Sequence, residues 1–332
     1  KLIQQTIYES IEPSRLPEYH SAVARAIEQQ GGVRANQQPS DLARHYWAAR
    51  SIDGLAKYAH YGVLTALEQM AALTPDDVMA QFEAILAIPE DEIYPQDRAL
   101  ALFGMGKCRW LISAGRATTS RAASAENYIN AFDIFVELGD TESALMVAAD
   151  SSFDFLDTRT MGFHNTAEQF VQRDTSVGGR IHLNMALAGY FNRQEFSASD
   201  SETLKELSRI LYVARRIQDT DLEREVLSHD ARIRVDLLDL EAGIDRSLHY
   251  LAITEAQGQF ADSNDPHFQT SRAYASLGDL ALAESHAPRL SRISTSIEHN
   301  ILTSQLHAMN WSLAICAGDW DAARAVLPGM RQ

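Results

Sequence analysis

Residue types that can carry out chemistry are present in this chain, but they do not form a known catalytic motif. The nearest approach to a phosphate-binding loop is Gly104-Met105-Gly106-Lys107-Cys108, which lacks the first glycine and the magnesium-ligating hydroxyl of G-x-x-x-x-G-K-[ST]. We therefore expect these small residues to bring two helices close together. Paired carboxylates such as Asp76 and Asp77 fall at predicted helix starts, where nothing nearby would raise a pKa for acid–base work. The sequence predicts that the chain is not an enzyme and binds no cofactor.

Residues that could hold a metal ion are spaced unfavourably. His299 and His307 share a helix face but lie about two turns apart. The oxygen-rich stretch 262–267 lacks the glycine and the distal glutamate of a calcium loop, so it predicts a capped turn. Cys108 and Cys316 form no C-x-x-C pair and fall in apolar helical surroundings. We expect no metal site, two buried free thiols and a reducing, cytoplasmic location.

One concentration of aromatic side chains is a candidate binding surface. Eight of the twelve phenylalanines lie between Phe132 and Phe196. An aromatic-lined groove would take an apolar ligand or a partner helix. The alternative, which we weight more heavily, is a hydrophobic core, because Phe132 and Phe135 have the spacing of a helix core stripe. The candidate ligand or partner residues are Tyr128, Phe132, Phe163, Phe170, Tyr190 and Phe191.

The charge of the chain argues against nucleic acid as a partner. The formal net charge is −16, and the basic residues are interspersed with acids rather than clustered. The densest arginine stretch, 215–234, holds as many acids and predicts a solvent face with many ion pairs. We find no run of eighteen apolar residues and no secretory leader, so no membrane association is expected. The start at Lys1-Leu2-Ile3, inside an apolar periodic run, suggests a piece of a longer protein.

The elements that would position any site are indicated by a short phrase that recurs. An apolar helical run is followed by a Gly-Asp pair, and an alanine stands five residues after the glycine. Glycine tolerates the left-handed residue that closes a helix, aspartate caps the next helix, and alanine lets two helices approach closely. We predict structural roles in these repeat turns for Gly139, Asp140 and Ala144, for Gly278, Asp279 and Ala283, and for Gly318, Asp319 and Ala323.

The hydrophobic period is 3.6 almost everywhere, and no alternating strand is convincing. The 40 residues from Gly278 to Gly318 fit a helix-pair repeat. We therefore expect an all-α fold, an α-solenoid of antiparallel helix pairs with a concave binding surface. The proline-containing stretch 89–95 and the stretch 174–180 are candidate boundaries. They divide the chain into 1–90, 91–178 and 179–332. The segment 158–179, at the end of the second part, is expected to be less regular.

The repeats resemble tetratricopeptide repeats (TPRs). Tyr128, Ala131, Leu138-Gly139-Asp140 and Ala144 occupy the relative places that this repeat expects. The resemblance implies TPR-like helix pairs that form a right-handed superhelix.

A second resemblance begins near the N-terminus. It is carried by Ile7-Tyr8-Glu9-Ser10-Ile11, Arg15-Leu16-Pro17-Glu18-Tyr19-His20 and Val23-Ala24-Arg25-Ala26-Ile27-Glu28, followed by helices at 41–49 and 57–66. This order is similar to the segment after the ATPase module of STAND-type signalling proteins, which include large LuxR-type regulators and ATPase-fused class III nucleotide cyclases. The stretch 213–219 resembles a turn of the same repeat region, with Gln218 in place of glycine. The first 90 residues would then follow an ATPase module that is not in this chain.

These resemblances imply a helical sensor arm that controls an ATPase switch. We expect a non-enzymatic scaffold that binds a protein or peptide partner, including other domains of its parent chain, on its concave face. The alternative is a receptor for a small-molecule inducer within the same solenoid. A third hypothesis, an all-helical enzyme, would need a carboxylate or histidine pocket that the sequence does not reveal.

Overall fold

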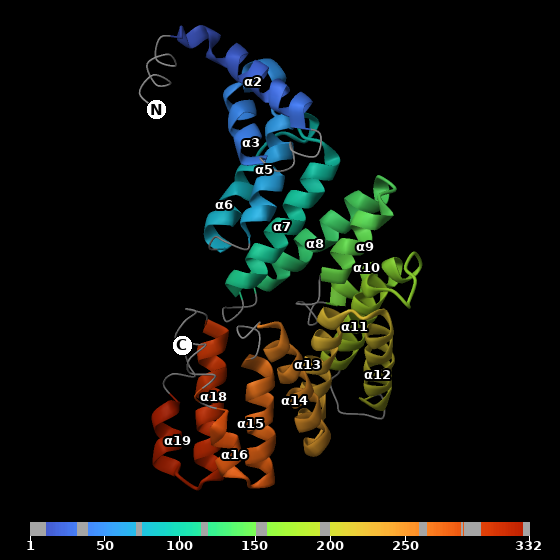
Figure 1. Ribbon diagram of the computed structural model, residues 1–332, viewed down its shortest axis with the longest axis vertical. Helices are drawn as coiled ribbons and strands as arrows, with labels where there is room; N and C mark the ends of the chain where they lie inside the picture. Colours follow the sequence, from blue (N-terminus) through green and yellow to red (C-terminus); the bar gives the residue numbers. More distant parts are fainter. Residues whose placement is uncertain are drawn as a thin grey trace. The chain divides into compact units, whose positions relative to one another are not determined.

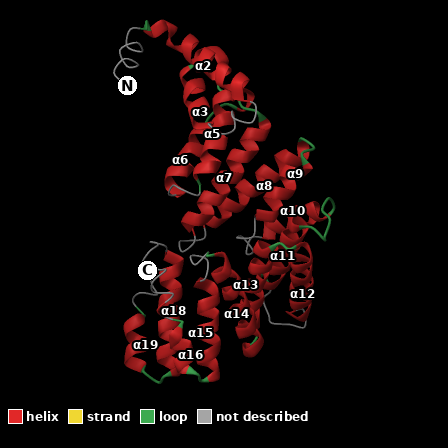
Figure 2. Cartoon of the chain, in the orientation of Figure 1, coloured by secondary structure: helices red, strands yellow, loops and turns green. Residues whose placement is uncertain are grey.

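The structure is a computed structural model that describes residues 11–31, 39–70, 75–113, 119–150, 158–192, 200–258, 264–286, 288 and 300–327. Within these residues the regular elements are all helices, and no strand occurs (Figure 2). Residue contacts divide the chain into two compact units, 1–163 and 164–332. The division into 1–90, 91–178 and 179–332 stays a prediction.

In the first unit, consecutive helices pack side by side (Figure 1). Helix α5 also contacts α7, the next helix but one, which is the contact pattern of stacked helix pairs. The elements are η1 (Pro13–Arg15), α2 (Leu16–Gly31), α3 (Pro39–Ala48), α4 (Arg50–Asp53), α5 (Ala56–Gln69), α6 (Pro75–Leu86), η3 (Glu90–Glu92), α7 (Pro95–Ser113), α8 (Thr119–Glu137) and α9 (Thr141–Asp150). Helix α10 (Thr158–Glu168) spans the division between the units.

Local sequence signals explain where these helices begin. Helix α6 starts at Pro75 with Asp76 and Asp77 in its first turn, where proline loses no hydrogen bond and the carboxylates face the positive end of the helix dipole. The candidate boundary at 89–95 contains the short helix η3. Part of the segment expected to be less regular, 158–179, forms helix α10, so that expectation was wrong there.

The glycines at 104 and 106 lie in the buried middle of α7, not in a loop. A Cβ atom on Gly104 would fall 2.2 Å from the ring of Phe82 on α6, and one on Gly106 would fall 3.1 Å from the ring of Tyr128 on α8. This is the tight helix contact that the small residues predict. Cys108 is buried in the same core, as expected. Cys316, at the end of α18 beside the turn at 317–318, is exposed, so the prediction that it is buried was wrong.

The second unit repeats the same arrangement. Each of its long helices packs on the next, and α13 also contacts both α11 and α15 (Figure 1). Its helices are α11 (Ser176–Phe191), α12 (Asp200–Ile217), α13 (Thr220–Asp236), α14 (Leu240–Gln257), α15 (Asn264–Leu277), α16 (Leu280–Ser285), α18 (Asn300–Cys316) and α19 (Trp320–Val326). The chain is therefore an all-α solenoid.

The turns at the Gly-Asp pairs share one hydrogen-bond pattern. Gly139, Gly278 and Gly318 have φ of +71°, +85° and +75°. Each glycine N–H donates to the carbonyl three residues earlier, and each following aspartate N–H donates to the carbonyl five residues earlier. This is the Schellman closure of a helix. The aspartate side chains then accept from the backbone N–H three residues on, at Ser143, Leu282 and Ala322, and so cap the next helix.

Two further turns have the same geometry without glycine. Gln218 and Leu238 have φ of +59° and +64°, and the N–H groups of Asp219 and Asp239 donate five residues back, as in the glycine turns. Gln218 was expected from the resemblance, whereas Leu238 carries no turn signal in its residue type. The position five residues after the left-handed residue is small in four of these five turns, and the exception is Glu223 after Gln218. Ala144, Ala283 and Ala323 are buried, and Gly243 takes that place after Leu238.

Candidate functional site

The candidate aromatic residues of the first unit lie in its core. Tyr128, Phe132 and Phe163 are all buried. The rings of Phe132 and Phe163 are 5.3 Å apart, and Phe103 meets Tyr128 edge-on at 5.6 Å. Edge-on and tilted ring pairs of this kind stabilise a core. These three side chains therefore offer little surface to a ligand.

The second unit holds the other three candidates. Tyr190 and Phe191 meet edge-on at the end of α11, with ring centroids 5.1 Å apart, and the guanidinium of Arg232 lies 5.0 Å from the Phe191 ring centroid. Tyr190 is buried and Phe191 half-buried. Phe170 is 52% exposed, in the turn after α10. Of the six candidates, Phe170 is thus the one whose ring is mostly open to solvent.

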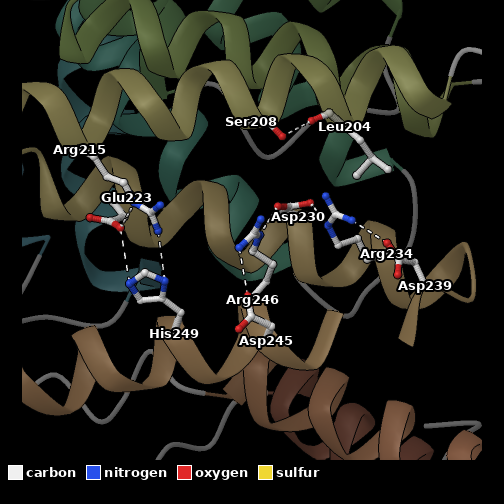
Figure 3. A network of polar contacts seen from close by, with 10 residues as sticks. All are labelled: Leu204, Ser208, Arg215, Glu223, Asp230, Arg234, Asp239, Asp245, Arg246 and His249. Atoms are coloured by element: carbon white, nitrogen blue, oxygen red, sulfur yellow. Dashed lines mark hydrogen bonds and ion pairs between the residues drawn. The ribbon is translucent and has the colours of Figure 1, made fainter. Parts of the chain in front are cut away.

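The arginine stretch of 215–234 forms ion pairs, but part of the network is buried (Figure 3). Asp230 on α13 is 1% exposed and accepts from Arg234 at 2.7 Å and from Arg246 of α14 at 2.8 Å. Arg234 also donates to Asp239, and Arg246 to Asp245. The stretch was expected to form a solvent-exposed face, but at Asp230 it forms a buried ionic link between α13 and α14.

A second part of this network joins three helices. Arg215 of α12 donates to Glu223 of α13 at 2.7 Å, and His249 of α14 lies 3.1 Å from Arg215 and 3.7 Å from Glu223 (Figure 3). Each charged group here has an oppositely charged neighbour. Every carboxylate and every arginine of this network therefore has an ion-pair partner, so the network acts as a structural link between helices.

A polar pocket in the second unit is different, because one of its carboxylates, Glu202, has no ion-pair partner among the described residues. It has a volume of about 310 Å³ and lies between the end of α10, the following turn, α11 and α12. One wall is apolar and comes from Met185, Ala186 and Gly189 of α11. The polar lining consists of Glu168, Arg173, His182, Glu202, Thr203 and Glu206.

His182 is the buried centre of this lining. The residue is 4% exposed, its Nδ1 lies 3.7 Å from Glu206, and its Nε2 lies 4.0 Å from Glu168. Nε2 has no hydrogen-bond partner among the described residues. Burial lowers the pKa of His182, and the charges of Arg173 and Arg209 lower it further, against the opposing effect of the two carboxylates. We therefore expect a neutral imidazole at pH 7.

Arginines hold two of the carboxylates in place. Arg173 pairs with Glu168, and Arg209 donates to both oxygens of Glu206 at 2.6–3.1 Å. Burial by itself would raise the pKa of Glu206, but the hydrogen bonds and charge of Arg209, with His182 and Arg173, keep it below its usual value. Glu202, in the first turn of α12, makes no ion pair within the described part of the chain.

The sequence contains a weak signal for this pocket. His182, Met185, Ala186 and Gly189 have the spacing of one helix stripe, but with a histidine and small residues where a core stripe would carry large aliphatic ones. The acids Glu202 and Glu206 are four residues apart and share a face of the next helix. Only packing of α11 on α12 shows that the two stripes meet.

A pocket in the first unit is lined by uncharged residues. This cavity of about 300 Å³ lies between α3, α5 and α6, and its lining includes Tyr58, Thr65, Gln81 and Ile85. Gln81 donates to Gln69 at 2.8 Å. With no charged group in the lining, this pocket has no feature that selects a ligand.

Within the described residues, no group of three or more His, Cys, Asp or Glu side chains could hold a metal ion. The described helices include none with the length and apolar character needed to cross a lipid bilayer. Of the histidine and oxygen-rich motifs noted in the sequence, His299 and residues 262–263 lie outside the described residues.

Comparison with known proteins defines the fold class. No family model matches the sequence, and no curated protein sequence matches it. Among solved structures, the chain is similar to a Signal Transduction ATPase with Numerous Domains (STAND) protein from Pyrococcus horikoshii, which has a tetratricopeptide repeat sensor. The TM-score is 0.55 at 11% identity, and the match covers 98% of this chain and 50% of that one.

The chain thus spans half the length of that ATPase. Yeast Tom70 also matches, over 95% of this chain and 77% of its own, with a TM-score of 0.37 and 11% identity. At these identities the similarity to the P. horikoshii protein shows the fold: a TPR-like helical repeat.

Proposed function

We propose that this chain is the TPR-like sensor region of a larger signal-transduction ATPase, and that it binds a protein or peptide partner on its concave face. In this proposal the chain performs no reaction itself. Its partners include other domains of its parent protein, and partner binding changes how the repeat region packs against the ATPase. The output of the parent, DNA binding or nucleotide cyclisation, comes from the resemblance to LuxR-type regulators and cyclase-linked ATPases.

The observation that carries this proposal is the match of nearly the whole chain to half of a STAND protein with a TPR sensor. A solenoid of this kind presents a long surface made of successive helix faces, which suits an extended partner. The acid surplus of the chain, a net charge of −16, favours a basic partner surface and speeds its association.

Two experiments test the proposal. The first is to read the gene upstream of the codon for Lys1, where a P-loop followed by an ATPase module is expected. The second is calorimetric titration of this chain with the separately produced upstream segment. Absence of a P-loop would refute the ATPase assignment, and absence of binding to the upstream segment would argue strongly against the regulatory mechanism.

A second candidate function is a receptor for a small-molecule inducer, and the pocket around His182 favours it. Its volume of about 310 Å³ is at the lower end of that of small-ligand sites. A thermal-shift screen of metabolites separates this function from peptide binding. A ligand at about 100 times its dissociation constant should stabilise the chain by roughly 2.7 kcal/mol. If no metabolite stabilises the chain but a protein or peptide partner binds it, the first candidate function alone is supported.

A further inference from the structure

The pocket between α10, α11 and α12 has an uncompensated negative charge. Glu168, Glu202 and Glu206 supply three carboxylates. Two guanidiniums face them, those of Arg173 and Arg209, and each is already paired with one carboxylate. Glu202 has no such partner within the described residues. One further positive charge would therefore balance the cluster.

The histidine does not supply that charge at neutral pH. His182 lies between Glu206 and Glu168, yet it is buried and stands near two arginines, which disfavours its protonated form. Its buried Nε2 has no hydrogen-bond partner among the described residues, and the residue is part of the pocket lining. A buried polar atom without a partner is unfavourable, and a ligand with a donor group would relieve it.

The apolar part of the lining indicates what carries the charge. Met185, Ala186 and Gly189 form an apolar surface on α11. Methionine adapts its shape to aliphatic groups. A ligand that combines an aliphatic stem with a cationic end would place the stem on this wall and the charge among the carboxylates.

We propose that this pocket binds one alkyl-guanidinium or alkyl-ammonium group, such as the side chain of an arginine or lysine. The cation would pair with the exposed Glu202 and with Oε2 of Glu168, because Arg173 engages Oε1 of Glu168 and Arg209 engages both oxygens of Glu206. This inference deepens the proposed function, because it names the chemical group that one site binds. It rests on the proposed function only in identifying the cation as part of a protein or peptide partner.

The test is calorimetry on the full chain with two short peptides. One is acetyl-Ala-Ala-Arg-Ala-Ala-amide, and the other carries citrulline, the neutral isostere of arginine, at its centre. The arginine peptide should bind about tenfold more tightly, since a charge-assisted hydrogen bond is stronger than a neutral one. Butylguanidine, a free compound with a single guanidinium charge, is titrated alongside. Tighter binding of butylguanidine would assign the cation to a small molecule, and tighter binding of the peptide to a partner side chain.

Glu202→Gln is the decisive variant, and Glu241→Gln is its control. Both glutamates are exposed and lie in the first turn of a helix, α12 and α14, but Glu241 lines no part of the pocket. Glu202→Gln should weaken binding of the arginine peptide about fivefold, the effect of one partly exposed ion pair, while Glu241→Gln leaves it unchanged. Melting curves of both variants check that the fold is intact.

Protonation of His182 offers a second readout. A charged imidazole would compensate Glu168 and Glu206 itself, so affinity for the arginine peptide should fall as the pH drops through the lowered pKa of His182. The His182→Gln variant should lose this pH dependence.

The proposal would be overturned by any of three results. These are equal binding of the arginine and citrulline peptides, equal effects of the two glutamine variants, or no binding of either cation up to about 10 mM. If the chain binds its upstream ATPase but none of these probes, the pocket assignment fails while the proposed function stands. If it binds the probes but not the ATPase, the proposed function fails while the pocket assignment stands.

Discussion

Leu238 and Gly278 occupy the same position in two helix–helix turns, although one is a branched aliphatic residue and the other is glycine. Their φ angles are +64° and +85°. Each N–H donates to the carbonyl three residues earlier, and the aspartate that follows each donates to the carbonyl five residues earlier. A left-handed conformation is unfavourable for a residue with a Cβ atom. The turn at Leu238 is therefore held by the packing of the helices on either side of it.

This relationship predicts the effect of changing either residue. Leu238→Gly should stabilise the chain by about 1 kcal/mol, because it removes the cost of the left-handed conformation from a side chain that is 77% exposed. Gly278→Ala should destabilise it by about the same amount. Urea unfolding of both variants measures the difference. A lower stability for Leu238→Gly would show that its side chain makes a contact that the turn needs.

The tight contact of α6 with α7 predicts a large effect for a small substitution. Gly104→Ala places a methyl group against the ring of Phe82, which cannot move without disturbing the core, and should cost about 1–3 kcal/mol. The control is Gly162→Ala on α10, where a Cβ atom meets nothing within 4 Å. That variant should gain up to about 1 kcal/mol, because alanine favours a helix more than glycine does. Thermal melting compares the two, and equal effects would contradict the close packing of Gly104.

The buried ionic link between α13 and α14 predicts a strong dependence on Asp230. Asp230→Asn leaves the guanidiniums of Arg234 and Arg246 without their shared buried partner and should cost about 3–5 kcal/mol. Asp245→Asn removes a carboxylate that is mostly exposed and also pairs with Arg246, and should change stability by less than about 1 kcal/mol. Urea unfolding measures both. Similar effects would mean that the Asp230 network is not buried in solution.

Histidine ionisation predicts that the fold loses stability in mild acid. Burial lowers the pKa values of His20, His45 and His182, and that of His229 to about 4, in each case with help from a nearby arginine. Below about pH 6.5 these histidines bind protons in the unfolded chain more readily than in the folded chain. The free energy of unfolding therefore decreases as the pH falls. The melting temperature should therefore decrease between pH 7 and pH 5.

His60 is predicted to act in the opposite direction. Its hydrogen bond to the buried Asp97 raises the pKa of His60, so its stabilisation is complete below about pH 6.5 and is lost as the pH rises through the raised value. His60→Gln should therefore destabilise the chain more at low pH than at high pH, whereas His182→Gln should do the reverse. Melting curves of the two variants across this range test the sign, and parallel curves would contradict both assignments.

The sequence predicted the helices and most of their ends from local chemistry. Pro75 with two acids begins α6, and the three Gly-Asp pairs end one helix and cap the next, because these signals act over a single turn of backbone. The repeat turn at Leu238 could not be predicted in this way. Nothing in the residue type indicates a left-handed conformation there, and the neighbouring helices impose it.

The candidate site was only partly accessible to the same reasoning. Aromatic residues signal burial and binding alike, and only packing shows that Phe132 meets Phe163 inside the core while Phe170 remains exposed. The signals at His182 and Glu202 are each weak, because a single histidine or glutamate on a helix is common. Their importance depends on Glu168, Arg173 and Glu206 lying around the same cavity.

The amino-acid sequence alone therefore determined an all-helical repeat, since helix period, capping and turn closure are set by residues within a few positions of one another. The tertiary structure decided which charges face each other across helices. Asp230 is neutralised by two arginines, whereas the pocket at Glu202 keeps a negative charge without a partner among the described residues. The reason is physical: electrostatic balance depends on distance in space, and the distance between two helix faces is fixed only when the helices pack.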